Sequence, residues 1–341
     1  MNSAIANILP VDPQHSALLE SVGATLTPLD PIGAVVQGLD LDSVAPPPAA
    51  VINALEYTMA QRGFIVFKSK RSLSPEHFLR ASCWWGGKVL HSTHGVHPAT
   101  PSGNRHIFRL SNDARQGIPG VGPQWHNDGS FNIGTFSHAG YHMVRAAEKG
   151  GGTCFAHQGA AFDVLTREQK ALWCRLSSVN ATSGAVHPAV HSHPISNRRS
   201  IWLHLGMTGA VILKHAKQHT FSLLDAAELT RLCRQYNAVL NAGFDNGYSI
   251  EYEYETNDCV FIDNLAVSHR ASAQAHLPAQ EQGLRIMHRS TTRAVNAFKP
   301  DFALPSVLDI TADQVRWVRG YGRQVALAFG GSPPHRCAIE G

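Results

Sequence analysis

The residues best suited to chemistry are two metal-ligand types placed two positions apart, His126 and Asp128, in the run Trp125-His126-Asn127-Asp128-Gly129. On a β-strand, residues i and i+2 point to the same face, so both side chains could reach one ion. Two imidazoles and one carboxylate on one octahedral face are the ligand set of non-haem iron(II) oxygenases. Such a site needs a third ligand, a histidine delivered by a partner strand far away in the sequence. A His-x-Asp pair alone has little weight in a chain with 20 histidines.

A second group of residues is suited to binding anions. Arg285, Met287 and Arg289 alternate along one run, so both guanidinium groups would face the same interior if the run is a strand. Two buried cations require anionic partners, which a dicarboxylate and an anionic substrate would supply. For an isolated pair of arginines, exposure on the surface would be the simpler interpretation. Thr153, after Gly151-Gly152, could likewise be a turn residue that leads into a strand.

Several other histidines are assigned structural roles. The alternating set His187, His191 and His193 could suggest a second metal site, but no carboxylate or cysteine lies near it in the sequence. We therefore interpret its His-Pro pairs as strand ends. Three histidines in the segments that follow His126 are interpreted as buried, hydrogen-bonded core residues: His138, His142 and His157. Asp263 and Asn264 are interpreted as a turn that positions His269, not as metal ligands.

These residues must be positioned by short strands with a few helices against them. The strict alternation of residues 248–255 predicts a strand with one buried face, and the apolar run 64–67 a buried strand. Two helices are predicted from apolar residues on one face, one through residues 52–59 that ends at Gly63 and one over 225–241. Two more are predicted from their N-terminal residues, a serine followed by a proline at 74–75 and a capping box at 166–169. Further strands are expected within 23–42 and at 259–262.

This order of elements predicts a mixed β fold with flanking helices, a double-stranded β-helix or jelly-roll barrel. A doubly wound fold is not indicated, because regular strand–helix alternation and a glycine-rich phosphate loop are both missing. We expect a loose leader at 1–21, one jelly-roll domain at 22–300, and a C-terminal extension with one helix at 301–341. Within the domain, the Gly-, Pro-, Asn- and Ser-rich segment 98–123 is interpreted as a surface loop and active-site lid.

Composition places the chain among globular proteins. Hydrophobic residues make up 43% and charged residues 16% of 341 positions, with a formal net charge of +4. No run of five basic residues indicates a nucleic-acid partner, and no apolar run is long enough to span a bilayer. The six cysteines form no CxxC pair, and the N-terminus has no secretory signal pattern. We expect a cytoplasmic protein with reduced thiols and a small-molecule substrate.

Taken in order, the motifs resemble those of the taurine dioxygenase (TauD/TfdA-like) family of iron(II)/2-oxoglutarate oxygenases. The His-x-Asp box is followed by Gly151-Gly152-Thr153, by two His-Pro pairs at 187–188 and 193–194, by Asp263-Asn264 before Ser268-His269, and by the closing run 285–289. The segment 33–41 is also similar to the family's N-terminal opening. The resemblance covers about residues 22–300.

The resemblance implies roles for individual residues. His126, Asp128 and His269 would hold Fe(II), and Thr153 and Arg285 would bind the distal carboxylate of 2-oxoglutarate. Arg289 would bind the anionic group of the substrate, with His94, His97 and Met207 in the substrate site. The reaction would oxidise, most simply hydroxylate, a substrate C–H bond using O2, with release of succinate and CO2. Two features depart from the family: an interval of 16 residues between His269 and Arg285, and a long tail whose helix could be a lid or a contact in a homo-oligomer.

Three alternatives remain open at this point. The same hydrogen abstraction could lead to desaturation, cyclisation or cleavage of a carbon–heteroatom bond in natural-product metabolism. The barrel could instead bind zinc and act as a hydrolase or lyase, but this would leave Thr153 and Arg285 without a role. A non-catalytic sensor of 2-oxoglutarate is the third, and the intact ligand set argues against it.

Overall fold

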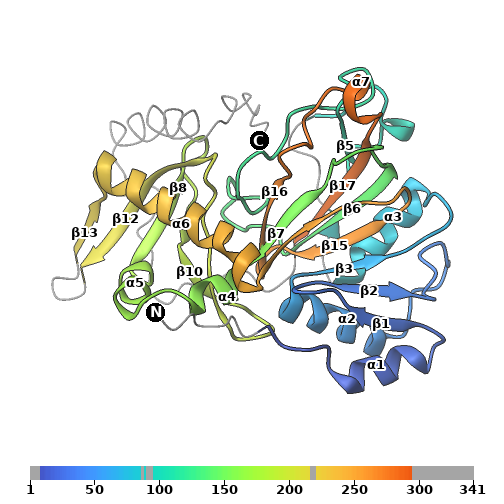
Figure 1. Ribbon diagram of the computed structural model, residues 1–341, viewed down its shortest axis with the longest axis horizontal. Helices are drawn as coiled ribbons and strands as arrows, with labels where there is room; N and C mark the ends of the chain where they lie inside the picture. The colour runs from blue at the N-terminus through green and yellow to red at the C-terminus, as the bar shows by residue number, and fades with distance from the viewer. Residues whose placement is uncertain (1–7, 86–87, 90–94, 216–219, 294–341) are drawn as a thin grey trace.

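The computed structural model describes residues 8–85, 88–89, 95–215 and 220–293. The predicted C-terminal extension and His94 lie outside these residues. In the part described, the largest sheet has eight strands (Figure 1), with the order β1-β2-β3-β15-β6-β17-β4 and with β5 also paired to β17. Strands β2 and β3 are parallel and the other pairs antiparallel. The bounds are β1 Thr25–Pro28, β2 Ala34–Gln37, β3 Phe64–Phe67, β15 Cys259–Asp263, β6 His138–Arg145, β17 Ile286–Arg293, β4 Lys88–Val89 and β5 Phe108–Ser111.

Helices pack on one face of this sheet and a smaller sheet lies on the other. The apolar side chains of α2 and α3 form one core cluster with alternate residues of β3 and β15, such as Phe67 and Phe261. On the opposite face, Phe64 of β3 stacks on Phe155 of β7, with ring centroids 4.5 Å apart. The bounds are α1 Pro13–Glu20, α2 Ala49–Arg62, α3 Pro75–Ser82, and, in the three-stranded sheet, β14 Ser249–Tyr252, β7 Thr153–His157 and β16 Val267–Ala271.

The chain between β7 and β14 forms a further part of the fold, separate from the main sheet and its helices. Helix α6, which carries the predicted stripe, packs with α4 and α5 in a core cluster that includes Trp125 and Tyr236. In Figure 1 the strands β8 and β12 lie at the left, near the beginning of α6, and the main sheet lies at the right. The bounds are α4 Gln158–Asp163, α5 Arg167–Trp173, α6 Ala226–Asn246, β8 Leu176–Asn180, β9 Val186–Pro188, β10 Val190–Ser192, β11 Arg199–Ile201, β12 Thr208–His215 and β13 Thr220–Leu223. Outside this segment are α7 Ala279–Gln282, between β16 and β17, and 3-10 turns at Cys83–Trp85 and Pro101–Gly103.

The local helix signals are confirmed. Gly63 ends α2 at a φ of 90°, and the Ser74 side chain caps α3, which begins at Pro75. Thr166 and Gln169 form the predicted capping box of α5, and an unpredicted second box, Asp225 with Glu228, starts α6. These caps depend on neighbouring residues alone, which is why the sequence shows them.

Three segments differ from the expectation. Part of the leader is helical: the Asp12 side chain caps α1, Pro13 follows it, and Leu19 is fully buried. The segment 98–123 is interrupted by β5, because Phe108–Ser111 pairs with the first half of β17. The strand predicted at 248–255 ends at Tyr252, where its pairing with β7 stops.

The mixed β architecture with flanking helices is as predicted. Hydrogen bonding in the described residues divides the strands among four sheets, which do not join into one closed barrel. Within the same residues no disulfide joins the cysteines, and no helix has the length and apolar character to span a membrane.

Candidate metal centre

His126, Asp128 and His269 lie together, as the sequence predicts, and each is nearly buried. Each offers one ligand atom, and the three atoms all lie within 4.8 Å of one another; the described residues contain no other such group. His126 is not in a regular strand. It makes an isolated bridge with His269 of β16, in which each backbone N–H donates to the other residue's carbonyl at 3.0 Å. Asp128 lies in the turn that follows, so the predicted strand geometry extends only to His126.

Each imidazole directs one ring nitrogen toward the centre of this group. His126 Nδ1 is 2.7 Å from the carbonyl oxygen of Gln124 and donates to it, which leaves Nε2 as the acceptor. His269 Nε2 lies 4.0 Å from Oδ2 of Asp128. Burial lowers the pKa of both rings, so both are neutral, the form that binds a metal.

Asp128 is charged and only partly satisfied. Burial acts to raise its pKa, but Arg289, followed by His269 and His126, outweighs this and lowers the pKa to about 2. Arg289 Nη1 donates to Oδ1 at 2.7 Å, whereas Oδ2, which faces His269, has no hydrogen-bond partner among the described residues. A buried carboxylate oxygen without a donor, beside two imidazole acceptors, fits a divalent transition-metal ion.

Asn264 holds the turn that carries Asp128. Its side-chain amide donates to the carbonyls of Asp128 and Phe136, at 2.9 and 2.8 Å, and its Oδ1 accepts from the N–H of Asp128 at 2.8 Å. Both backbone groups of Asp128 are therefore bonded to one side chain. The Asp263-Asn264 pair lies at the turn between β15 and β16, the strand of His269, as expected, and Asn264 also holds the other ligand segment.

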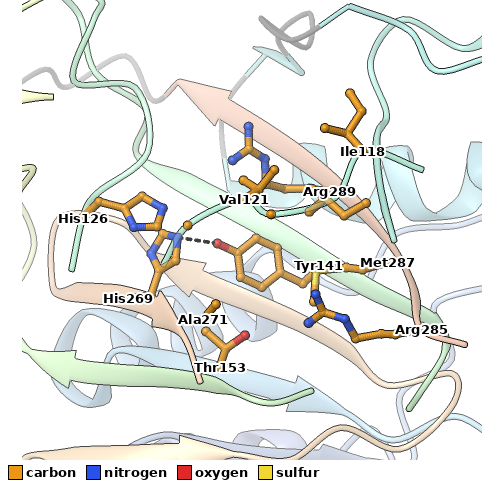
Figure 2. A pocket seen from close by; sticks show the side chains of 13 residues that line it. Ile118, Val121, His126, Tyr141, Thr153, His269, Ala271, Arg285, Met287 and Arg289 are labelled. Atoms are coloured by element: carbon orange, nitrogen blue, oxygen red, sulfur yellow. Dashed lines mark hydrogen bonds between the residues drawn. The ribbon is translucent and has the colours of Figure 1, made fainter. Parts of the chain in front are cut away.

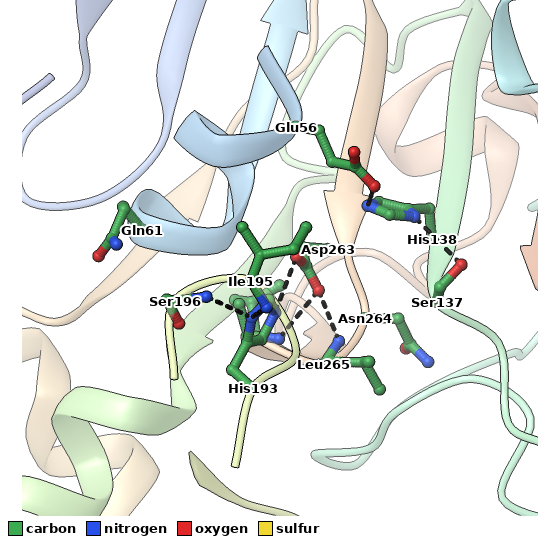
Figure 3. A network of polar contacts seen from close by, with 12 residues as sticks. Glu56, Gln61, Ser137, His138, His193, Ile195, Ser196, Asp263, Asn264 and Leu265 are labelled. Carbon is green, nitrogen blue, oxygen red and sulfur yellow. Dashed lines mark hydrogen bonds and ion pairs between the residues drawn. The ribbon is translucent and has the colours of Figure 1, made fainter. Parts of the chain in front are cut away.

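Asp263 in turn fixes the backbone around Asn264 (Figure 3). Its Oδ1 accepts from the N–H groups of Leu265 and Ala266, and its Oδ2 is 2.9 Å from His193 Nε2. His193 Nδ1 accepts from the N–H groups of Ile195 and Ser196, so Nε2 carries the hydrogen that Asp263 receives. The structural role predicted for the histidines at 187–193 is confirmed: Nε2 of His191 bonds to Leu265 O, and Nε2 of His187 to Ser130 O.

A pocket leads from the candidate metal ligands His126 and His269 to Arg285 and Thr153 (Figure 2). It is lined by Leu110, Ile118, Gly120, Val121, Gly122, His126, Tyr141, Thr153, His269, Ala271, Arg285, Met287 and Arg289. The predicted alternation is confirmed, because the three residues at 285, 287 and 289 all face this space. The loop 98–123 supplies one wall. At its end Gly122 has a φ of +71°, and a Cβ there would lie 2.9 Å from His126 Cε1, so glycine is required.

The end of the pocket away from the metal ligands has free donors. Arg285 Nη1 donates to the carbonyl of Gly151 at 2.9 Å, and its buried Nε has no partner in the described part of the chain. Tyr254 donates its hydroxyl to Thr153 Oγ1 at 2.9 Å, so the hydrogen of Thr153 is available for another acceptor. A guanidinium and a hydroxyl at one end of a pocket suit a carboxylate.

The residues expected to bind the substrate are less closely grouped. Arg289 lines the pocket, and its Nε is buried without a partner among the described residues. His97 does not line it: Nε2 is bonded to Ala114 O and Nδ1 to Ala99 N, within the loop. Met207 lies beside Ser130, whose Oγ is 4.0 Å from its sulfur, near the turn after Asp128.

One tyrosine in this pocket and one next to it are absent from the predicted site residues. Tyr141 lines the pocket beside the metal ligands, and Tyr254 contacts Thr153. The alternation of 248–255 places Tyr252 and Tyr254 on one face and could have drawn attention to Tyr254. No alternation marks Tyr141, because six consecutive residues of β6, from His138 to Met143, are buried.

Comparisons with known proteins agree with this geometry. The family model "Taurine catabolism dioxygenase TauD, TfdA family" matches residues 25–291. A curated relative, an alpha-ketoglutarate-dependent sulfonate dioxygenase from Saccharomyces cerevisiae, is 21% identical over 280 residues; the match covers 75% of this chain but 64% of the relative's length.

Solved structures show the same fold. A taurine dioxygenase from Burkholderia xenovorans has a TM-score of 0.64 at 18% identity, covering 83% of this chain and 97% of that one. The structure of AAD-2 in complex with Mn(II) and N-oxalylglycine has a TM-score of 0.61 at 19% identity, covering 81% and 99%. With the family model matching most of its length, this chain belongs to the TauD/TfdA family of dioxygenases.

Proposed function

We propose that this protein is an Fe(II)- and 2-oxoglutarate-dependent dioxygenase that oxidises, and most simply hydroxylates, a C–H bond of a small anionic substrate. The observation that supports it best is the arrangement of one pocket. His126 and His269 line one end, where their ligand atoms and that of Asp128 lie within 4.8 Å of one another, and the carboxylate-binding groups of Arg285 and Thr153 lie at the other end. This spacing of a metal site and a cationic group suits a dicarboxylate that chelates the ion with its 2-oxo-acid end.

The residues of the chain would have distinct tasks. His126 and His269, with Asp128, would hold the ion, which when bound would supply the oxygen chemistry. Arg285 and Thr153 would orient 2-oxoglutarate by its distal carboxylate. The Mn(II) and N-oxalylglycine bound in the AAD-2 structure support this assignment, since N-oxalylglycine is also a dicarboxylate with an adjacent oxo group. Leu110, Ile118 and Val121 would shield the pocket from water.

The test measures binding and turnover separately. We expect 2-oxoglutarate to bind to the Fe(II)-loaded protein under anaerobic conditions, and succinate to be released in air when a panel of small sulfonates and carboxylates is supplied. His126→Ala, Asp128→Ala and His269→Ala should each abolish succinate release while the circular dichroism spectrum stays that of the wild type. Full turnover in excess chelator, or no binding of 2-oxoglutarate to the metal-loaded protein, would refute the proposal.

The anionic character of the substrate rests on Arg289 and on the sulfonate named for the yeast relative. Arg289 already has a counter-ion in Asp128, but its Nε remains buried and without a partner among the described residues. A substrate anion would bind to these remaining donors. Arg289→Met should lose turnover of the best anionic substrate and keep 2-oxoglutarate binding near that of the wild type, whereas Arg289→Lys should keep the same binding and retain part of the turnover. Equal turnover of a neutral substrate by the wild type and Arg289→Met would refute this part.

A further inference from the structure

The hydroxyl group of Tyr141 is buried inside the pocket, and none of the residue roles proposed above involves it. It lies in β6, between Val260 of β15 and Arg289 of β17 in the sheet, and is 4% exposed. Figure 2 shows its side chain pointing across the pocket to His269, and its hydroxyl oxygen is 2.8 Å from His269 Nε2. The tyrosine donates its hydrogen when the ring carries its own hydrogen on Nδ1, which is the tautomer whose Nε2 lone pair could bind an ion.

This hydrogen bond uses the lone pair that a metal ion would need. His269 Nε2 faces Asp128 Oδ2 at 4.0 Å and belongs to the candidate metal centre. One nitrogen lone pair cannot both accept a hydrogen and bind an ion. A buried hydroxyl left without an acceptor is costly. When His269 binds the ion, the hydroxyl of Tyr141 therefore needs another acceptor nearby.

The acceptors in reach are the Asp128 carboxylate and an oxygen of a molecule bound beside it. Both carboxylate oxygens of Asp128 already have a role, because Oδ1 accepts a hydrogen bond from Arg289 and Oδ2 faces the candidate metal site. The pocket, however, continues from Tyr141 to Thr153 and Arg285. A dicarboxylate fixed at that far end would bring its other carboxylate to the ion, next to the tyrosine hydroxyl.

We propose that Tyr141 is a further co-substrate-binding residue, which donates a hydrogen bond to the metal-chelating carboxylate of a 2-oxo acid. The inference rests on the proposed function, because it assumes that a 2-oxo acid binds in this pocket. Arg285 and Thr153 then recognise the distal carboxylate, and Tyr141 recognises the 2-oxo-acid end. The two ends of the co-substrate would be read by different residues.

The test is anaerobic calorimetric titration of Mn(II)-loaded protein with 2-oxoglutarate and with pyruvate, which has the 2-oxo-acid end but no distal carboxylate. Tyr141→Phe should weaken binding of both about 10- to 100-fold, the effect of losing one hydrogen bond to a charged group. Arg285→Gln should weaken 2-oxoglutarate and leave pyruvate unchanged. Tyr248→Phe is a matched control, since its hydroxyl donates to Val239 O outside the pocket, and it should change neither.

The Mn(II) affinity of each variant without 2-oxo acid separates the possible roles of Tyr141. We expect it to stay within about threefold of the wild type in Tyr141→Phe, because the phenol is not a metal ligand. Unchanged 2-oxoglutarate and pyruvate affinity in Tyr141→Phe would overturn the inference, and so would a loss found only in Mn(II) affinity. If the wild type itself bound no 2-oxo acid, the proposed function would fail as well, which distinguishes that result from failure of the tyrosine assignment alone.

Discussion

Five almost fully buried histidines should make the stability of this protein depend steeply on pH. They are His142, His157, His187, His191 and His288, none more than 4% exposed. Burial lowers their pKa values, to about 3 for His157, His191 and His288 and to about 4 for His142 and His187. In an unfolded chain each would have a pKa of about 6.5. Below that pH the unfolded protein binds protons that the folded protein does not.

The sign and size of the effect follow from proton linkage. A histidine whose pKa is lowered by folding costs no stability above about pH 6.5, and stability is lost as the pH falls from there toward its folded pKa. At about pH 5.5 each of the five costs about 1.4 kcal/mol, so together they remove about 7 kcal/mol of the free energy of unfolding. Typical domains have about 5–15 kcal/mol in total, so we expect unfolding near pH 5.

Urea denaturation followed by tryptophan fluorescence, repeated between pH 8 and pH 5, measures this dependence. The free energy of unfolding should fall with a slope equivalent to four to five protons at about pH 5.5. His142→Leu tests one site, because neither ring nitrogen of His142 has a hydrogen-bond partner among the described residues. The difference in free energy of unfolding between this variant and the wild type should shift by about 1.4 kcal/mol in favour of the variant when the pH is lowered from 8 to 5.5. A slope of one proton or less would refute the reasoning.

Three further predictions concern the residues that build the site. Asn264→Ala removes three buried hydrogen bonds, so it should lower the free energy of unfolding, measured by urea denaturation, by about 2–4 kcal/mol. It should also weaken Mn(II) binding, because Asn264 fixes the backbone of Asp128. A Mn(II) affinity equal to that of the wild type would show that Asp128 does not depend on these hydrogen bonds. Asp263→Asn should lower the free energy of unfolding at pH 7 by about 2 kcal/mol in urea denaturation, because a carboxyl whose pKa is lowered to about 2 by folding stabilises the fold at every pH above its unfolded pKa. Stability at pH 7 equal to that of the wild type would contradict this. In calorimetric titrations, Arg285→Gln should weaken 2-oxoglutarate binding about 10- to 150-fold, and Thr153→Val should weaken it up to about tenfold. If both variants bound 2-oxoglutarate as tightly as the wild type, these two residues would not bind its distal carboxylate.

The sequence predicts the features of this protein that depend on neighbouring residues. The caps at Ser74 and Thr166 and the shared face of Arg285 and Arg289 are all set within a few positions, and all are confirmed. The three candidate metal ligands, predicted from their residue types and the family resemblance, lie together in the structure. Their strand geometry was not, because Asp128 is placed by a turn and not by the alternation of a strand.

What the sequence does not reveal is contact between distant segments. Asn264 bonds to Asp128 across 136 positions, and nothing in the local pattern of either segment indicates that pairing. Tyr141 lies in a strand that is buried on both faces, where period-2 alternation disappears and the pocket side cannot be distinguished from the core side. In both cases the missing information is which strands lie next to each other.

Arg289 shows how such a contact changes a functional argument. From the sequence, a buried cation on the pocket face requires an anion, and an anionic substrate was the inferred partner. In the structure Asp128 is that anion, at 2.7 Å, so the burial of Arg289 by itself no longer demands a charged substrate. The same contact gives Arg289 a second task, because its charge is the largest influence that lowers the pKa of Asp128 against the effect of burial. A metal ion at Asp128 would supply positive charge there in its place, which would leave Arg289 better able to bind an anion of the substrate.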